Sequence, residues 1–381
     1  MRIGVTTIAV VTTLLLPGCT RLRYYLQATQ GEMNLLGSAR PIAEVIANPR
    51  TPPRLRRALE QAQAMRRFAI HVLHLPDNGS FRDYAPLPRH YVVWNVFAAP
   101  RFSVHLIHWC FPVAGCVPYR GYFSHARARR YALALAQRGD DVYLAGVPTF
   151  STLGWMPDPL LSTEIYRSPA ETAGLIFHEL AHALVYVPGD PVFNESFAVT
   201  VQETGVRRWL RATHEPQRLR RYDRAQRFNE TFGVLVQRYR RRLDRVYREG
   251  GTRRVLEEKK QRLFSGLSQM ISRAGRCFGF HVRIPAPLNN ATLGALATYT
   301  DLVPAFREIL RQDRHHLVRF YATVRRISHW PKARRTAWLR SQLPALAARP
   351  CVHRPRAGAT DRARQPATRG RGARDRPPAV R

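Results

Sequence analysis

The chain has 381 residues, 45% of them apolar, which is enough for one large domain with a buried core. Its formal net charge is +35, and all but three of its 61 basic residues are arginine. No helix-turn-helix, zinc-finger or RNA-recognition pattern accompanies this charge, so the composition favours a solvated, arginine-biased surface and no nucleic-acid partner.

The first residues have the pattern of an export signal. Arg2 precedes an apolar run too short to span a membrane as a stable helix, and the run ends in LPGC at residues 16–19. This ending resembles the bacterial lipobox, in which Cys19 is lipidated and begins the mature chain. The alternative is a plain secretory signal with an incidental cysteine. Because Thr20 and not aspartate follows Cys19, we expect an outer-membrane lipoprotein facing the periplasm, with residues 1–18 as its signal peptide.

Helices are predicted after the signal, and strands follow them. Residues 20–70 have apolar side chains at helical spacing, with a break at the prolines near residue 52. From about residue 76 to 160, short apolar runs such as HYVVWNVFAAP and DVYLAGV alternate with Pro, Gly, Asn and Asp clusters, which is typical of strands and turns. One helix, at residues 126–139, interrupts this strand-rich segment.

The strand-rich segment contains two closely spaced cysteines, Cys110 and Cys116. Their spacing does not fit the usual zinc knuckle, and in an oxidising compartment they are predicted to form a disulfide. Cys277 and Cys351 have no evident mates, and a bond between them stays open.

From residue 168 to about 345 the pattern is helical almost throughout. Residues 215–275 predict a charged helical hairpin broken at Gly250-Gly251. From residue 346 to 381 the chain is rich in Arg, Pro, Gly and Ala, and it has too few large apolar residues to order itself. The expected organisation is a signal peptide (1–18), one main domain (19–345) and a disordered tail (346–381).

The helical part begins with the motif His-Glu-x-x-His in the stretch LIFHELAHALVYV. Ser168-Pro169-Ala170-Glu171 has the layout of a capping box with proline at the first helical position, so a helix is predicted to begin there and to end before Pro188-Gly189. On that helix His178 and His182 lie one turn apart on the same face, as two ligands of one ion must.

A returning helix supplies the third ligand. The first helix is expected to continue five residues past His182, about 7.5 Å, and the next helix to begin at Asp190-Pro191. Glu195, about 7.5 Å along that second helix, is then level with His182 across a gap of roughly 8–10 Å. Glu203 is the alternative, but it lies two turns further on.

Two histidines and one carboxylate form a ligand set typical of catalytic zinc, with one position left for water. Glu179, beside His178, is the expected general base. A neutral donor should stabilise the oxyanion, and Tyr122 and Tyr143 are candidates because they lie in the segment expected to face the cleft.

These stretches resemble the putative zinc aminopeptidase family of Gram-negative lipoproteins, which is gluzincin-like in layout. The likeness lies in LIFHELAHALVYV, DPVFNESFAVTVQETGVRRWL, WCFPVAGCVPYRGYF and NNATLGALATYTDLVPAFREIL, and it covers about residues 15–340. The resemblance implies an α+β, predominantly helical metallopeptidase core with a small strand-rich segment before the metal-binding helix pair. It also implies one zinc ion held by His178, His182 and Glu195, with Glu179 as base.

The resemblance further implies an aminopeptidase that acts on peptides. Such an enzyme binds a free amine, for which Glu164, Glu203 and Asp158 are candidates, although each is equally suited to a structural salt bridge. The segment VYLAGVPTF, at residues 142–150, is the expected edge strand for an extended peptide. The alternative from another class is a non-catalytic envelope lipoprotein that binds polyanions or anionic lipid through its arginine-rich surface.

Overall fold

The computed structural model describes residues 24–343, apart from residues 25, 26, 28, 112–114, 150–156, 285, 287, 299 and 300. The described residues all belong to one compact unit, which spans residues 1–349. The predicted signal peptide, the predicted lipidation site Cys19, Cys351 and the predicted tail from residue 346 lie outside the described residues.

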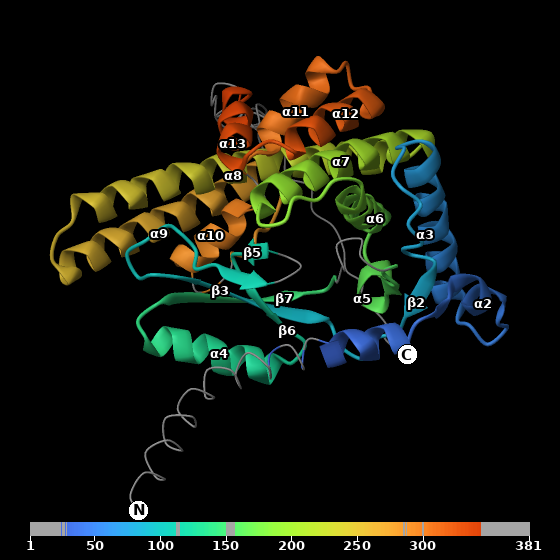
Figure 1. Cartoon of the computed structure of the whole chain (residues 1–381), viewed down its shortest axis with the longest axis horizontal. Helices are drawn as coiled ribbons and strands as arrows, with labels where there is room; N and C mark the ends of the chain where they lie inside the picture. Colours follow the sequence, from blue (N-terminus) through green and yellow to red (C-terminus); the bar gives the residue numbers. More distant parts are fainter. Residues whose placement is uncertain are drawn as a thin grey trace, which may run out of the picture. The chain divides into compact units, whose positions relative to one another are not determined.

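Helices dominate the described part of the chain (Figure 1). Their bounds are α2 Ile42–Ala47, α3 Pro53–His71, α4 His125–Gln137, α5 Ser162–Ile165, α6 Pro169–Leu184, α7 Pro191–Ala212, α8 Pro216–Glu249, α9 Arg253–Cys277, α10 Asn290–Thr298, α11 Val303–Gln312, α12 Leu317–Ser328 and α13 Lys332–Ser341. Residues 29–37 are also helical. This α+β, predominantly helical architecture confirms the predicted fold class.

The strands are short and most lie in the predicted strand-rich segment. They are β1 Arg40–Pro41, β2 Asp83–Ala85, β3 Val93–Ala99, β4 Trp109–Phe111, β5 Gly115–Val117, β6 Arg120–Tyr122, β7 Asp141–Val147 and β8 Leu160–Leu161. The described strands form sheets in the orders β1-β2-β8 and β6-β3-β7, and β4 pairs with β5. In the second sheet β3 is antiparallel to both neighbours, so β7 is an edge strand of the described sheet.

Helices cover both faces of the β6-β3-β7 sheet (Figure 1). Successive side chains of a strand point to opposite faces. Val96 accordingly packs with Leu135 of α4, whereas its neighbour Phe97 packs with Ala295 of α10. The α10 face is the one that borders the cavity described below, and the α4 face is closed by an apolar cluster.

Helices α6 and α7 lie side by side in the largest apolar core. Phe177 of α6 and Phe193 and Phe197 of α7 are fully buried there, and α3 and α11 pack against the pair from outside. Fully burying one large apolar side chain contributes roughly 1.5–3 kcal/mol. The helix pair that carries the His-Glu-x-x-His motif is therefore a fixed scaffold.

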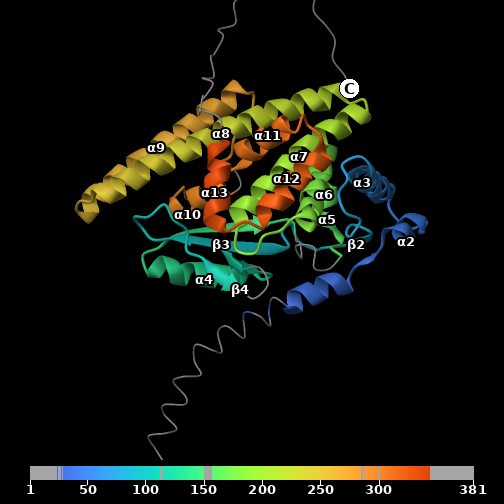
Figure 2. The ribbon, with the colours of Figure 1, turned by 45° about the horizontal axis from the view of Figure 1, so that its top comes forward.

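The predicted charged hairpin is formed by α8 and α9, which run beside each other in Figure 2. Gly250 between them has a φ of 75°, which suits glycine, and the Thr252 side chain caps α9 by accepting from Val255 N. Buried residues of both helices, including Val236 and Leu267, form a second core. Many charged residues of the hairpin are exposed, as the sequence predicts, but Lys260 of α9 is buried and pairs with Asp141 of β7.

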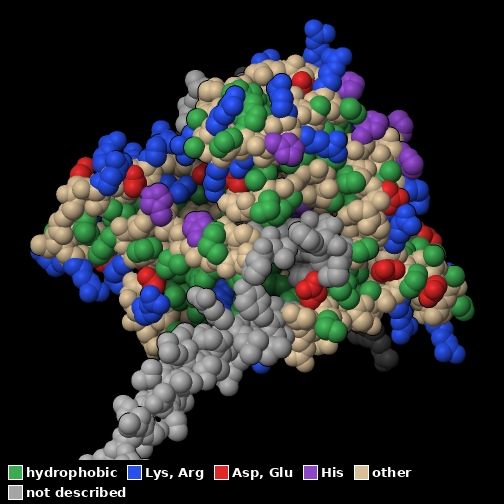
Figure 3. All heavy atoms as spheres, viewed as in Figure 1, with side chains coloured by type: hydrophobic (Ala, Val, Ile, Leu, Met, Phe, Trp, Pro, Cys, Tyr) green, Lys and Arg blue, Asp and Glu red, His purple; other side chains and the backbone are tan. Residues whose placement is uncertain are grey.

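Basic side chains are scattered over the surface visible in Figure 3, with fewer acidic ones among them. The visible face has no single gathered basic patch. Among the described residues, no helix has both the length and the apolar character that crossing a bilayer requires.

Candidate metal centre

Helix α6 begins at the predicted capping box. Ser168 Oγ accepts a hydrogen bond from Glu171 N at 3.4 Å, and Glu171 Oε2 accepts one from Ser168 N at 3.0 Å. Pro169 occupies the first helical position. These local interactions fix where the helix starts and hence which face carries His178 and His182.

Helix α6 ends at Leu184, earlier than the expected end at Val187. Val187 precedes a proline, a position that disfavours helical backbone. The side chain of Asn194 satisfies the freed peptide groups, because its Oδ1 accepts from Val187 N at 2.8 Å and its Nδ2 donates to Val187 O at 2.9 Å. His182 therefore lies in the last turn of α6, directly before a short turn held by α7.

Helix α7 begins where predicted, at Pro191 after the cap Asp190. Asp190 accepts from Phe193 N at 3.4 Å, and its Oδ2 also accepts from Arg335 Nε at 3.1 Å and Nη2 at 2.5 Å. Both Asp190 and Arg335 are buried. This pair anchors the start of α7 and so sets the position of Glu195.

The three predicted ligand side chains converge. His178 Nε2 lies 3.1 Å from His182 Nε2 and 3.2 Å from Glu195 Oε2, and His182 Nε2 lies 3.7 Å from Glu195 Oε1. Ligand atoms about 2.1 Å from a tetrahedral ion would be roughly 3.4 Å apart. Two imidazole nitrogens and one carboxylate at this spacing fit a divalent metal ion, and His178, His182 and Glu195 could hold one.

The charges in this cluster are coupled. Although burial alone lowers the pKa of His178, its hydrogen bond with Glu195 and the charges of Glu195 and Glu179 raise that pKa to about 9. Burial and the His178 charge lower the pKa of His182 to about 4, although Glu195 opposes this. Burial raises the pKa of Glu195, but the two histidines outweigh it and the pKa is lowered. One imidazolium, one neutral imidazole and one carboxylate thus share the site.

The outer ring nitrogens of the two histidines differ in their surroundings. His178 Nδ1 lies 3.1 Å from Gln202 Oε1, which accepts a hydrogen bond from it and leaves Nε2 directed at the cluster. His182 Nδ1 is buried without a hydrogen-bond partner in the described part of the chain. Gln202, two helical turns after Glu195, therefore orients the His178 ring through a hydrogen bond to the ring nitrogen that does not face the cluster.

Glu179 lies beside the cluster on α6 and is half-buried. Its negative charge helps to raise the pKa of Tyr119 and that of Glu164, so it is electrostatically coupled to both. Burial is the larger cause in each case. The predicted base is thus electrostatically coupled to a buried carboxyl group and to a phenol.

The two tyrosines expected near the cleft have different positions. Tyr122 is buried on the α4 face of the sheet, where its ring contacts Tyr24 and Tyr131. Tyr143 lines the cavity on the other face and stacks on Phe97. Neither has a contact with the three ligand residues among the described interactions.

Tyr119 is electrostatically coupled to the cluster, and the sequence did not single it out. Burial is the main cause of its raised pKa, and the charges of Glu195 and Glu179 raise it further. Its ring packs 5.6 Å from that of Phe97. The phenol therefore keeps its proton at neutral pH and is available as a hydrogen-bond donor.

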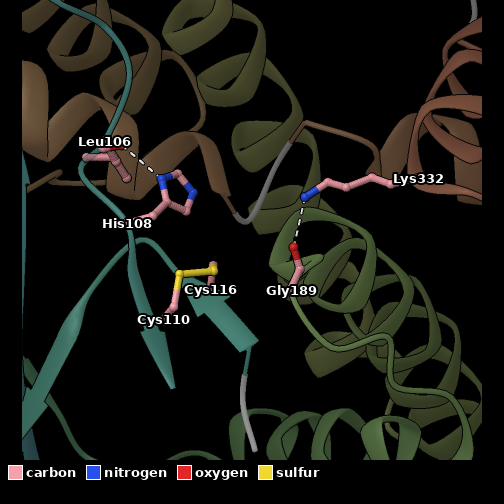
Figure 4. Close-up of a disulfide and its surroundings, with 6 residues drawn as sticks. All are labelled: Leu106, His108, Cys110, Cys116, Gly189 and Lys332. Atoms are coloured by element: carbon pink, nitrogen blue, oxygen red, sulfur yellow. Dashed lines mark hydrogen bonds between the residues drawn. A yellow bond between two sulfur atoms is a disulfide. The ribbon is translucent and has the colours of Figure 1, made fainter. Parts of the chain in front are cut away.

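A disulfide joins Cys110 of β4 to Cys116 of β5. This hairpin lies against the α6–α7 turn, since a Cβ atom added to Gly115 would come within 2.5 Å of Gly189 N. Figure 4 shows the disulfide and Gly189 in the same region, with Lys332 Nζ donating to Gly189 O at 2.8 Å. The turn is thus held between the hairpin on one side and α13 on the other.

Next to the cluster is a cavity of 1420 Å³. One wall consists of β3 and β7, with Tyr143, Ala145 and Val147 alternating along the edge strand. The opposite wall is α7, which contributes Val199 and Gln202. The cavity thus extends over the α10 face of the sheet from the neighbourhood of His178.

The candidate amine-binding carboxylates have different surroundings. Glu203 forms a two-pronged ion pair with Arg307, at 2.7 and 2.8 Å. Glu164 is buried, accepts from Leu161 N at 2.9 Å, and has a pKa well above its usual value, chiefly because of burial. Asp158 is also buried and adds to the raised pKa of Glu164. Glu164 is therefore electrostatically coupled to the predicted base and to Asp158, whereas Glu203 is paired with Arg307.

Comparison with known proteins identifies one family. No curated protein and no solved structure has a significant match to the chain. A family model described as "Putative aminopeptidase" matches residues 23–339, which include the helix pair, the sheet and the hairpin with the disulfide. The chain therefore belongs to this family, Aminopep, whose description implies a peptide substrate.

Proposed function

We propose that the protein is a zinc-dependent aminopeptidase. The observation that carries this proposal is the convergence of His178, His182 and Glu195, with Glu179 next to the first ligand. Two imidazole nitrogens and one carboxylate form a ligand set that catalytic zinc sites use. The family supports the exopeptidase part of the proposal.

The chemistry supplied by zinc at such a site is the activation of water and the polarisation of a carbonyl. Glu179 accepts the proton of the attacking water and then gives it to the leaving amine. Its half-buried position and its place beside His178 suit this transfer. Tyr119, whose phenol is electrostatically coupled to Glu195 and Glu179, is the proposed hydrogen-bond donor to the oxygen on which charge develops.

The peptide is bound along the edge strand β7. An extended peptide can add to a sheet edge through main-chain hydrogen bonds, with side chains of alternate residues in pockets. Tyr143, Ala145 and Val147 border the cavity from this strand. Glu164 and Asp158 are buried, and Glu164 is electrostatically coupled to both Asp158 and Glu179; these two carboxyl groups are the proposed partners of the free amine.

The sequence supports a periplasmic location. Lipidation at Cys19 would tether the enzyme to the outer membrane, and the disulfide between Cys110 and Cys116 suits an oxidising compartment. The polyanion-binding alternative predicts binding that persists without metal and weakens steeply with salt. Figure 3 gives it little support, since the basic side chains on the visible face are scattered.

Zinc content and peptide hydrolysis of the full chain test the proposal together. We expect about one zinc ion per chain for the wild type and a clear loss for Glu195→Ala. Glu179→Gln should retain zinc but hydrolyse peptides at least about 10²-fold more slowly. A folded, disulfide-containing protein that takes up no added zinc would refute the metal site, and full activity of Glu179→Gln would refute the base.

A further inference from the structure

The cavity beside the metal cluster is larger than a pocket for one side chain. At 1420 Å³ it exceeds the roughly 300–1,000 Å³ of most small-molecule pockets. Its lining includes Gln202, whose side chain contacts His178, and residues of α8, α11 and α13. A substrate residue at the cluster therefore leaves room for further residues along the cavity.

One face of helix α13 borders this cavity. Lys332, Thr336 and Arg340 line it, and their spacing of four residues places them along one side of the helix. Arg241 of α8 lines it as well. All three basic side chains are exposed to solvent.

Five carboxylates line the cavity, together with five basic side chains: Arg241, Arg307, Arg311, Lys332 and Arg340. Each lining carboxylate has an arginine partner, and the pairs are Asp190–Arg335, Glu203–Arg307, Glu230–Arg307, Asp301–Arg240 and Glu308–Arg311. Within the described part of the chain, no carboxylate forms an ion pair with Arg241, Lys332 or Arg340. Arg241, Lys332 and Arg340 thus have no direct ion pair among the described residues, although the charge of Arg340 also acts on Asp301.

Lys332 can bind a substrate without losing its present contact. Figure 4 shows it on the α13 side and His108 on the β4 side of the space around Gly189 and the disulfide. Its ammonium donates one hydrogen bond to Gly189 O at 2.8 Å, and two further protons are available. The side chain is therefore positioned at the cavity and retains donors for a carboxylate.

We propose that the cavity binds the C-terminal part of a short peptide, and that the peptide's terminal carboxylate is recognised by Lys332, Arg340 and Arg241. This inference rests on the proposed function, because it takes the N-terminal residue of the same peptide to lie at the metal cluster. The substrate class is then oligopeptides with a free C-terminus, in preference to the N-termini of folded proteins.

Kinetics on the holoenzyme, with a pentapeptide acid and the amide of the same sequence, test the proposal. We expect a KM for the acid about three- to tenfold lower than for the amide, with equal kcat, since exposed charge pairs are individually weak. The triple variant Arg241→Gln/Lys332→Gln/Arg340→Gln should give the two substrates the same KM. The control Arg334→Gln removes the same charge from another face of α13, where Arg334 lies over the Trp330 ring, and should leave the preference intact.

Equal KM values for acid and amide in the wild type would overturn the proposal. So would an Arg334→Gln variant that loses the preference for the acid to the same extent as the variant of the cavity-lining residues. Calorimetry of both peptides with the full-length Glu179→Gln variant measures binding without hydrolysis. It distinguishes a failure of carboxylate recognition from a failure of the proposed peptidase function. A preference for the acid in binding, without hydrolysis by the wild type, would support carboxylate recognition and refute the peptidase. Hydrolysis without any preference would refute carboxylate recognition alone.

Discussion

His178 Nε2 and Glu195 Oε2 lie 3.2 Å apart and form an ion pair. Both atoms are among those that converge on the candidate metal position. A proton on His178 Nε2 and a metal ion therefore compete for the same lone pair. The metal-free site is held together by this proton, and its affinity for metal must depend on pH.

Zinc binding at pH 7 is expected to release about one proton. The pKa of His178 is raised to about 9, so this residue is protonated at pH 7, whereas His182, with a pKa of about 4, is already neutral. Proton release should fall toward zero as the pH rises above 9. Calorimetry in two buffers with different protonation enthalpies measures it, and no release at pH 7 would contradict the ion pair.

Removal of the Gln202 side-chain amide should weaken metal binding while the fold remains intact. Gln202→Leu takes away the acceptor that lies 3.1 Å from His178 Nδ1, and such losses reduce metal affinity by about 10- to 100-fold. Gln202→Glu keeps an acceptor and should retain the affinity. Gln63→Leu serves as the control, because Gln63 donates to Phe81 O and has no contact with the three ligand residues among the described interactions. The interpretation fails if both leucine variants lose zinc equally.

The tyrosine that stabilises the developing oxyanion can be identified by comparing phenylalanine variants. Tyr119→Phe should lower kcat by about 10²-fold with little change in zinc content. Tyr122→Phe should leave kcat unchanged, because that ring lies in the cluster on the α4 face. A loss of kcat in Tyr143→Phe but not in Tyr119→Phe would transfer the role to the cavity wall.

The disulfide should stabilise both the fold and the metal centre. Cys110→Ala/Cys116→Ala removes a cross-link that closes a short loop, at a cost of about 2 kcal/mol in unfolding free energy. Because Gly115 packs against Gly189, the variant should also bind zinc more weakly. Urea denaturation and a zinc titration check the two effects, and unchanged zinc affinity would show that the hairpin does not hold the turn.

Much of the metal centre could be predicted because its signals are local. The capping box at Ser168, the one-turn spacing of His178 and His182, and the cap at Asp190 are all read within one helix or turn. Even the early end of α6 left Glu195 in reach, since the turn is closed by Asn194. The spacing of Gln202 from Glu195, two helical turns, was a further local signal that could have identified it.

The supporting residues could not be predicted in this way. Arg335 reaches Asp190 from 145 positions away in the sequence, and Tyr119 is brought to the cluster by the sheet and the hairpin. Periodicity within a segment contains no information on which distant segment packs against it. The placement of Tyr122 on the α4 face likewise depends on the strand register, in which Trp94 pairs with Tyr122.

The buried pair of Asp190 and Arg335 should contribute to metal binding through the start of α7. Asp190→Ala leaves the Arg335 guanidinium buried without its carboxylate, which should cost about 3–5 kcal/mol of unfolding free energy. The same change removes the side-chain cap of α7 and the anchor of the α6–α7 turn, so zinc affinity should also fall. Urea denaturation and competition with a chelator measure the two quantities.

Lys260→Ala provides the control that separates the two effects. It breaks another buried pair, with Asp141 at 2.7 Å, but that pair joins α9 to β7 and has no contact with the α6–α7 turn among the described interactions. A comparable loss of stability with unchanged zinc affinity is expected. If Lys260→Ala and Asp190→Ala instead lose zinc in proportion to their stability, metal binding follows the global fold, and Arg335 does not position the ligands.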